Sequence, residues 1–435
     1  MDLHTSRCGV PPRKLRNRPR WRLGLENTAE NVNCVEMNEV LAPYDVAVIG
    51  GGPAGLAAAI ALALTGAKTA LIARQTPYAD NRTTALLGGS VEFLQELDVW
   101  PRCKDNAAAL QTMRLVDDTG RLIRAPEVRF SSSEIGLDQF GYNIENRLLM
   151  TALEQRAAEL PTLVRFDNEA ETVRTGEPQV TIRTSEGKSL SARLVAGADG
   201  RHSLCRQAAG ISVRRRDLHQ AALTFNVSHS RPHRNISTEF HTSQGPCVFV
   251  PLPGDRCSVV WVAAPREAER LRALSDDELS EAAESRSHSI LGRLRVEPGR
   301  HLFPLAIEQP AQFARGRIVL IGEAAHVLPP IGAQGLNLGL RDAADVADIV
   351  GAAIVSGDDP GSPQVINRYD QVRRADVFSR TFAIDLANRT LLSDFLPLQS
   401  LRAAGLHLIG SFGPLRRIAM REGLAPSWRA SRRLS

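Results

Sequence analysis

Residues 45–66 read Asp45-Val-Ala-Val-Ile-Gly50-Gly-Gly-Pro-Ala-Gly55-Leu-Ala-Ala-Ala-Ile-Ala-Leu-Ala-Leu-Thr-Gly66, and this stretch decides the fold. Its first five residues predict a short buried strand, and the alanine- and leucine-rich run after Gly55 predicts a helix that ends near Gly66. The glycines at 50, 52 and 55 fit G-x-G-x-x-G, which permits a tight turn, a close approach of a pyrophosphate and close helix packing. The amides that open the helix attract phosphate.

Two other interpretations of this stretch stay open at this point. A strand–turn–helix unit without a ligand would use the same glycines. Residues 46–63 are also almost uncharged, as a membrane-spanning segment would be. Four glycines and a proline at the head of the run argue against one continuous spanning helix.

Charge is distributed unevenly along the chain. The formal net charge is +5, but residues 1–24 and residues 400–435 each carry seven Lys or Arg against one acid. Residues 25–399 hold 39 basic and 46 acidic residues. This mildly acidic body has no basic helix or aromatic RNA-binding motif, so we expect no nucleic-acid partner. The basic tails suit an anionic membrane surface, or they are simply solvated.

Cysteine usage and the N-terminus indicate the compartment. Six cysteines show no C-x-x-C pair and no ligand spacing with histidine, so we expect reduced thiols, no metal and a cytoplasmic location. Residues 1–42 are predicted to be a disordered basic extension without a secretory signal. Met37 lies just ahead of the first strand, so whether residues 1–36 are translated stays open. In a eukaryote, an Arg-rich leader would be typical of a mitochondrial transit peptide.

The second strand departs from the usual dinucleotide pattern. Residues 68–74 predict a parallel strand, whose end normally carries an acid that holds ribose hydroxyls. Ala73 and Arg74 stand there instead. Arg82 is a candidate anion contact, and the alternative is an ordinary surface arginine.

A second motif follows a helix predicted over residues 144–160 and an antiparallel meander over 172–190. It consists of a short apolar strand from Leu194, an Asp199-Gly200 turn, and a helix start with Ser203 and Arg206 one turn apart. Residues 111–130 and 217–308 are rich in strand-like runs and predict a second sheet, with one polar helix near 276–294.

A third motif spans residues 317–342. It comprises a buried strand, a Gly/Pro loop and a long helix to about Ser356. Small residues at Gly332, Ala333, Gly335 and Gly339 would let the backbone lie against a flat ligand, and the helix amides can stabilise negative charge on a ring edge. A further helix is predicted over 367–389, followed by an amphipathic tail at 396–424.

These three motifs, in this order, resemble the class A FAD-dependent aromatic monooxygenases, over roughly residues 43–424. The resemblance implies an α/β, p-hydroxybenzoate-hydroxylase-like fold with a Rossmann-type FAD-binding domain, an inserted antiparallel-sheet substrate domain and C-terminal helices. The FAD-binding domain is then discontinuous (43–110, 144–212 and 309–364). The substrate domain comprises 111–143 and 213–308, and the C-terminal helical region is 365–435.

The same resemblance implies that NAD(P)H reduces FAD, which then uses O2 to hydroxylate an electron-rich ring. It assigns no catalytic residue and no metal. His326 is a tempting general base, but we expect a structural histidine because it lies on the cofactor motif. Glu323 replaces the motif's usual Asp, and Ala333 replaces a usual Gly. The residues expected to bind FAD are Gly50, Gly52, Pro53, Ala54, Gly55, Arg82, Asp199, Gly200, Arg206, Gly322, Glu323, Pro330, Gly332, Gln334, Gly335 and Asn337.

Within that class, three stretches resemble the ubiquinone-biosynthesis hydroxylases: Glu239-Phe240 with residues 245–253, residues 330–342, and the tail around Leu401 and Pro414. This implies a polyprenylated phenol as substrate, other ubiquinone-biosynthesis proteins as partners, and a tail that either packs on the FAD domain or contacts the inner membrane face (the matrix side in mitochondria). Alternatives are a hydroxylase of another aromatic compound, a reductase of isoprenoid double bonds, or a non-catalytic scaffold. A halogenase is disfavoured because Trp261 is not followed by the halogenase motif.

Overall fold

The computed structural model describes residues 43–75, 78, 81–120, 126–330 and 332–392, with 413, 416, 417 and 420; residues 382–392 are described as helix only. Every described residue belongs to one compact unit. The predicted N-terminal extension and most of the predicted C-terminal tail therefore lie outside the described residues.

The first sheet is built around parallel strands. Its order is β18-β19-β11-β1-β2-β8, and antiparallel β10 and β9 extend it from β11. Because β1 lies between β2 and β11, and β11 lies beside β19, the three sequence motifs follow neighbouring strands at the same sheet edge. The bounds are β1 Tyr44–Ile49, β2 Thr69–Ile72, β8 Leu163–Phe166, β9 Ala170–Arg174, β10 Val180–Thr184, β11 Ser189–Gly197, β18 Ala314–Arg315 and β19 Ile318–Leu320.

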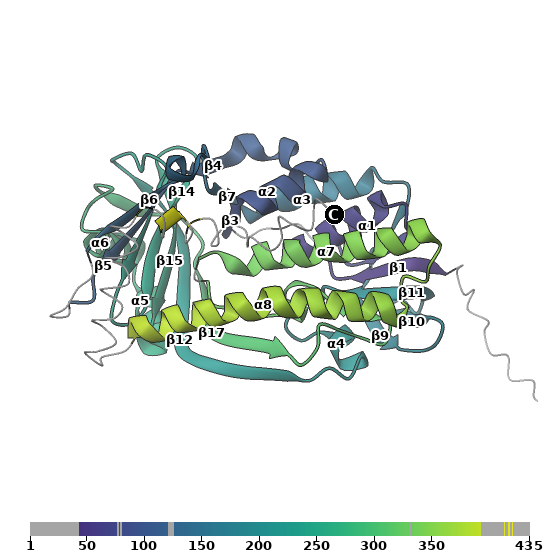
Figure 1. The fold of residues 1–435 in the computed structure, drawn as a ribbon. Helices are drawn as coiled ribbons and strands as arrows, with labels where there is room; N and C mark the ends of the chain where they lie inside the picture. Colours follow the sequence, from purple (N-terminus) through teal and green to yellow (C-terminus); the bar gives the residue numbers. More distant parts are fainter. Residues whose placement is uncertain are drawn as a thin grey trace, which may run out of the picture. The chain divides into compact units, whose positions relative to one another are not determined.

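Helices cover this sheet through small side chains. α1 (Pro53–Leu64) is buried from Gly55 through Ala63, as its alanine-rich sequence permits. α7 (Gln334–Ser356) approaches it so closely that a Cβ atom on Gly339 would lie 3.0 Å from the Ala54 Cβ. α8 (Pro363–Leu392) runs beside α7 (Figure 1). The remaining helices of this part are α2 Gly88–Glu96, α3 Asn146–Ala158 and α4 Leu204–Ala208.

The second sheet has the order β16-β12-β15-β14-β13-β5-β6, and β17 also pairs with β12. All its pairs are antiparallel except β13 with β5. β12 and β17 form one long ladder (Figure 1). The bounds are β5 Thr112–Asp117, β6 Val128–Ser131, β12 Val213–His229, β13 Ile236–His241, β14 Pro246–Leu252, β15 Arg256–Ala263, β16 Leu294–Val296 and β17 His301–Pro310, with α5 Pro265–Ala273 and α6 Asp276–Arg286.

A third, small sheet joins β3 (Thr83–Leu87), β7 (Gly141–Glu145) and β4 (Ala107–Leu110). The sequence prediction is wrong in part for this sheet. Ile144 is predicted at the start of a helix, but it lies in β7, where it pairs with Thr84 of β3. The helix, α3, begins at Asn146. α5 was also missed, because its mostly polar sequence has only two buried residues. The predicted α/β fold with an antiparallel second sheet is confirmed, whereas the domain boundaries stay a prediction.

Two described residues of the C-terminal tail pack on the protein. The Nε atom of Arg416 lies 2.6 Å from Glu134, and its guanidinium lies 5.0 Å from the centre of the Phe130 ring. Met420 is buried. Among the described residues, no helix has the length and apolar character needed to cross a bilayer.

Candidate functional site

The glycine loop after β1 uses its glycines for different purposes. A Cβ atom on Gly50 would lie 2.2 Å from the Ala198 carbonyl oxygen, and one on Gly55 would lie 2.1 Å from the Gly50 carbonyl oxygen. Gly50 also has φ +116°, which a larger residue rarely adopts. A Cβ on Gly52 would meet nothing within 4 Å. Folding therefore requires Gly50 and Gly55, whereas Gly52 borders open space.

That space is a cleft of about 620 Å³, which we call the glycine-loop cleft. Gly52 is the N-cap of α1, Pro53 and Ala54 begin the helix, and no side chain caps it. Amides at such a helix start bind phosphate well. The site thus fits the diphosphate of FAD. The cleft is lined by Ile49, Gly50, Gly51, Gly52, Ile72, Ala73, Arg74, Tyr78, Met150, Glu154, Asn168, Glu169, Ala170, Asp199, His202 and Leu204.

Ala73 lies in the wall of this cleft, where the missing acid would stand. Arg74 beside it forms an exposed ion pair with Glu169 at 3.5 Å. No carboxylate therefore stands at the end of β2, and adenosine-side binding would fall to the backbone of the glycine loop and to the rest of the cleft wall, where Glu154 and Glu169 carry carboxylates.

We expect Ala73→Glu to be tolerated and to tighten FAD binding by up to about tenfold, because a carboxylate hydrogen-bonded to hydroxyls contributes roughly 1.5 kcal/mol. Fluorescence titration of the apoprotein with FAD measures this. Ala170→Glu, on the same cleft wall but on β9, is the control. Weaker FAD binding by Ala73→Glu would mean that this position does not face the ribose.

The Asp199-Gly200 turn holds neighbouring loops together. The Asp199 carboxylate accepts hydrogen bonds from the Ser203 hydroxyl at 2.6 Å and from the Cys205 amide at 3.0 Å. Gly200 has φ +78°, which suits the tight turn. The Arg206 guanidinium donates to the Ala324 carbonyl at 2.8 Å. Arg206 therefore ties this turn to the loop after β19, and its direct contact with a cofactor stays a prediction.

A buried ionic network supports the loop after β19. The Asp342 carboxylate accepts a hydrogen bond from the Gly322 amide and lies 2.8 Å from His326 Nε2. Arg373 of α8 lies 2.6 Å from the other oxygen of Asp342. Burial raises the pKa of the Asp342 carboxyl, but the charges of Arg373 and His326 outweigh it, so the net pKa is lowered. His326 is only 3% exposed and anchors this loop, which supports a structural role.

The start of α7 is held in an uncommon conformation. Ala333 is its N-cap with φ +55°, where the resemblance expects glycine. The Gln334 amide donates to the Gly332 carbonyl at 3.0 Å and accepts from Arg380 at 3.1 Å. Asn337 is fully buried and bonds to Leu87, Ala85 and Ala333 backbone atoms. These bonds join α7 to β3, and a direct contact of Asn337 with the cofactor stays a prediction.

Arg82 and Glu323 border a second cavity, of about 560 Å³, between the loop after β19 and the β12–β15–β17 strands. The Arg82 guanidinium donates to the Tyr78 hydroxyl at 2.8 Å and lies 5.5 Å from the centre of the Phe303 ring. The Glu323 side chain is 60% exposed and lies 3.4 Å from Arg201. Both predicted residues thus reach the same open space, where Pro330 also lies.

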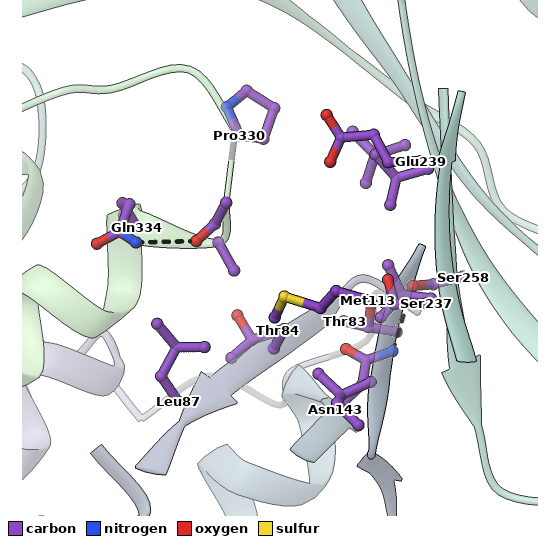
Figure 2. A pocket seen from close by; sticks show the side chains of 18 of the residues that line it. Thr83, Thr84, Leu87, Met113, Asn143, Ser237, Glu239, Ser258, Pro330 and Gln334 are labelled. Carbon is purple, nitrogen blue, oxygen red and sulfur yellow. Dashed lines mark hydrogen bonds between the residues drawn. The ribbon is translucent and has the colours of Figure 1, made fainter. Parts of the chain in front are cut away.

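A third cavity, which we call the inner cavity, has a volume of about 310 Å³ and separates the second sheet from the start of α7 (Figure 2). Pro330, Gly332, Gln334 and Gly335 form one wall. The residues of the opposite walls were not predicted, because they come from β3, β4, β5, β7 and β13–β15. They are Thr83, Thr84, Ala85, Leu87, Leu110, Met113, Arg114, Leu115, Asn143, Ser237, Glu239, Val248, Val250, Ser258 and Val260.

Comparisons with known proteins identify a family, curated relatives and a similar fold. Residues 43–380 match a family described as FAD binding domain. The chain is 31% identical to ubiquinone hydroxylase UbiL of Rhodospirillum rubrum, over 87% of this chain and 89% of that protein. It is 30% identical to the Escherichia coli 3-demethoxyubiquinol 3-hydroxylase, over 88% and 98%. The structure of p-nitrophenol 4-monooxygenase PnpA from Pseudomonas putida superposes with a TM-score of 0.72 at 22% identity, covering 88% of this chain and 98% of that one.

Proposed function

The chain belongs to the FAD-binding-domain family of class A flavoprotein monooxygenases, among the ubiquinone-biosynthesis hydroxylases, and on that premise we propose that it hydroxylates the ring of a polyprenylated phenol with NAD(P)H and O2. When bound, FAD supplies the redox chemistry that activates O2. The residues of this chain bind and orient the cofactor and the ring, and they exclude water.

The observation that carries this proposal is the position of the inner cavity. It lies directly against Pro330, Gly332 and Gln334, which the sequence motif assigns to the flavin side. Its lining is mostly apolar with a few polar side chains, as small-molecule sites usually are. At about 310 Å³ it accommodates an aromatic ring with short substituents, so a long prenyl chain would extend out of it.

Deletion of the gene in its host tests this function. We expect ubiquinone to fall and a polyprenylated phenol lacking one ring hydroxyl to accumulate, identified by mass spectrometry. Complementation with the wild-type gene should remove the precursor. Normal ubiquinone in a deletion strain with no second such hydroxylase would contradict the proposal.

A prenylated substrate is delivered from a bilayer, so we further propose peripheral contact with the membrane surface. Flotation with anionic liposomes should recover more of the full chain than of a truncation after residue 395. The ion pair between Arg416 and Glu134 favours a tail whose other face packs on the protein. Equal flotation of the two proteins would exclude the tail as the contact.

A further inference from the structure

One carboxylate stands on the sheet wall of the inner cavity. Glu239 lies on β13, whose alternation places Ser237 and Glu239 on the cavity side and Thr238 and Phe240 on the other. Phe240 is packed in the apolar core behind the sheet. Figure 2 shows the Glu239 side chain extending from the strand toward Pro330. The carboxylate therefore borders the space between the sheet and the loop that leads into α7.

Among the described residues that line this cavity, Glu239 and Arg114 are the only ionisable ones. Arg114 pairs with Thr238 across the β13–β5 ladder, so its side chain leaves the sheet on the side opposite Glu239. Its guanidinium donates to Glu127 at 2.7 Å. Arg114 therefore does not neutralise Glu239, and the charge inside the cavity comes from Glu239.

The two carboxylate oxygens of Glu239 differ in their surroundings. Oε1 lies 3.0 Å from His241 Nε2, on the same face of β13. No described residue donates a hydrogen bond to Oε2. Both side chains are 19% exposed, so the pair reaches solvent and a proton can leave the cavity along it.

Other charged groups near this pair are engaged elsewhere. The one ionisable side chain of β14 is Cys247, which is fully buried and pairs with Phe240, so it faces the side of the sheet opposite Glu239. On β5, Asp117 accepts a hydrogen bond from the Thr119 hydroxyl, and beyond its end Asp118 pairs with Arg286 of α6 at 2.7 Å. His288 also lies 3.1 Å from Asp118.

We propose that Glu239 is a catalytic residue of the hydroxylation: its Oε2 accepts the hydrogen bond of the substrate's phenolic hydroxyl and takes up that proton during ring hydroxylation. This inference rests on the proposed function and deepens it. Nothing in the three cofactor motifs assigns a proton acceptor, and among the described residues that line the cavity Glu239 is the carboxylate that can serve.

The step balances with O2 and the reductant already named as co-substrates. A π-electron pair of the ring attacks an electrophilic oxygen atom derived from O2 and forms the new C–O bond, while the O–O bond breaks and its electron pair leaves with the other oxygen atom, which ends as water. The phenolic oxygen, now strongly acidic, gives its proton to Glu239 Oε2 as its O–H electron pair becomes the second bond of a carbonyl. The ring hydrogen then leaves as a proton, its C–H electron pair restores the aromatic ring, and the carbonyl oxygen takes back the proton from the Glu239 carboxyl group.

Binding of a chromogenic phenol tests the placement of Glu239 without turnover. We would titrate the FAD-loaded protein with 2-geranyl-4-nitrophenol and follow phenolate absorbance against pH. The ionised Glu239 carboxylate accepts a hydrogen bond from the phenolic O–H, and its negative charge disfavours the phenolate. The pKa of the bound phenol should therefore rise relative to the free phenol. Glu239→Gln should lower the pKa of the bound phenol by about one unit or more relative to wild type. An equal pKa in both proteins would overturn the proposal.

Turnover of 2-geranylphenol gives the second readout. Glu239→Gln should form hydroxylated product about a hundredfold more slowly, with KM, FAD content and NAD(P)H oxidation nearly unchanged and H2O2 formed instead. Glu239→Asp should recover part of the rate, and Glu281→Gln, on the exposed face of α6, should match wild type. Unchanged product formation by Glu239→Gln would overturn the proposal. A wild-type protein that forms no product, yet in which Glu239 controls the pKa of the bound phenol, would instead contradict the proposed function alone.

Discussion

Gly52→Val is expected to yield a folded protein that holds no FAD. A Cβ atom at Gly52 would meet no protein atom within 4 Å, so valine can be accommodated by the fold. Its side chain would fill the part of the glycine-loop cleft that the FAD diphosphate needs to approach the α1 amides. We expect FAD affinity to fall at least a thousandfold, which corresponds to about 4 kcal/mol. Flavin absorbance of the purified protein and calorimetric titration with FAD measure the loss.

Two comparisons make this prediction specific. Gly89→Val places the same substitution on an exposed glycine of α2 that also borders open space, and it should retain FAD. Gly55→Val should fail to fold, because its Cβ would collide with the Gly50 carbonyl. A Gly52→Val protein that binds FAD as tightly as the wild type would refute the placement of the diphosphate.

Arg373→Met is expected to destabilise the fold by about 3–5 kcal/mol, because it leaves buried carboxylates without their cation. Arg373 is fully buried, and its guanidinium lies 2.6 Å from Asp342, 2.7 Å from Asp345 and 2.8 Å from Asp376. Asp342 in turn accepts a hydrogen bond from the Gly322 amide, so the substitution would also weaken the support of the loop after β19. Equilibrium unfolding in urea at several pH values measures the effect.

The pH dependence separates this mechanism from a simple packing defect. The pKa of Asp342 lies below its ordinary value in the folded wild type, so its ionisation stabilises the fold at neutral pH and that stability is lost as pH falls through the folded pKa. In Arg373→Met, buried Asp342 should be protonated nearer to neutrality. The stability difference between the two proteins should therefore shrink in acid.

Arg374→Met is the matched control for this variant. Arg374 is adjacent in sequence, but its side chain is 54% exposed in its ion pair with Asp370. Arg374→Met should therefore lower the free energy of unfolding by less than about 1 kcal/mol. A loss in Arg373→Met that equals that of Arg374→Met, or that does not change with pH, would contradict the role assigned to the buried network.

Local patterns were sufficient to predict the three strand–turn–helix motifs of the first sheet. Each motif combines a strand, a turn and a helix that are contiguous in sequence, so Gly50, Asp199 and Gly322 could be placed at strand ends without knowledge of the register. Their meeting at one sheet edge follows from the parallel pairing of β1, β11 and β19. The fold class was correct for the same reason.

The inner cavity could not be predicted in the same way. Its walls join residues such as Thr83, Asn143 and Glu239, which are far apart in sequence and are brought together by strand register and crossing sheets. Arg373 falls within the helix predicted over 367–389, but its burial against Asp342 depends on how α8 packs on α7. The hydrogen bonds of Asn337 to the backbone of β3 could not be predicted either, because they too depend on packing between segments that are far apart in sequence.

The central claim is that this chain transfers oxygen from O2 to an aromatic ring. Single-turnover incubation of the FAD-loaded protein with NADH or NADPH, 2-geranylphenol and ¹⁸O2, followed by mass spectrometry, tests it most directly. We predict a hydroxylated product that carries one ¹⁸O atom in its new hydroxyl group. An FAD-loaded protein that consumes the reductant and ¹⁸O2 but gives only unlabelled or reduced product would contradict the account.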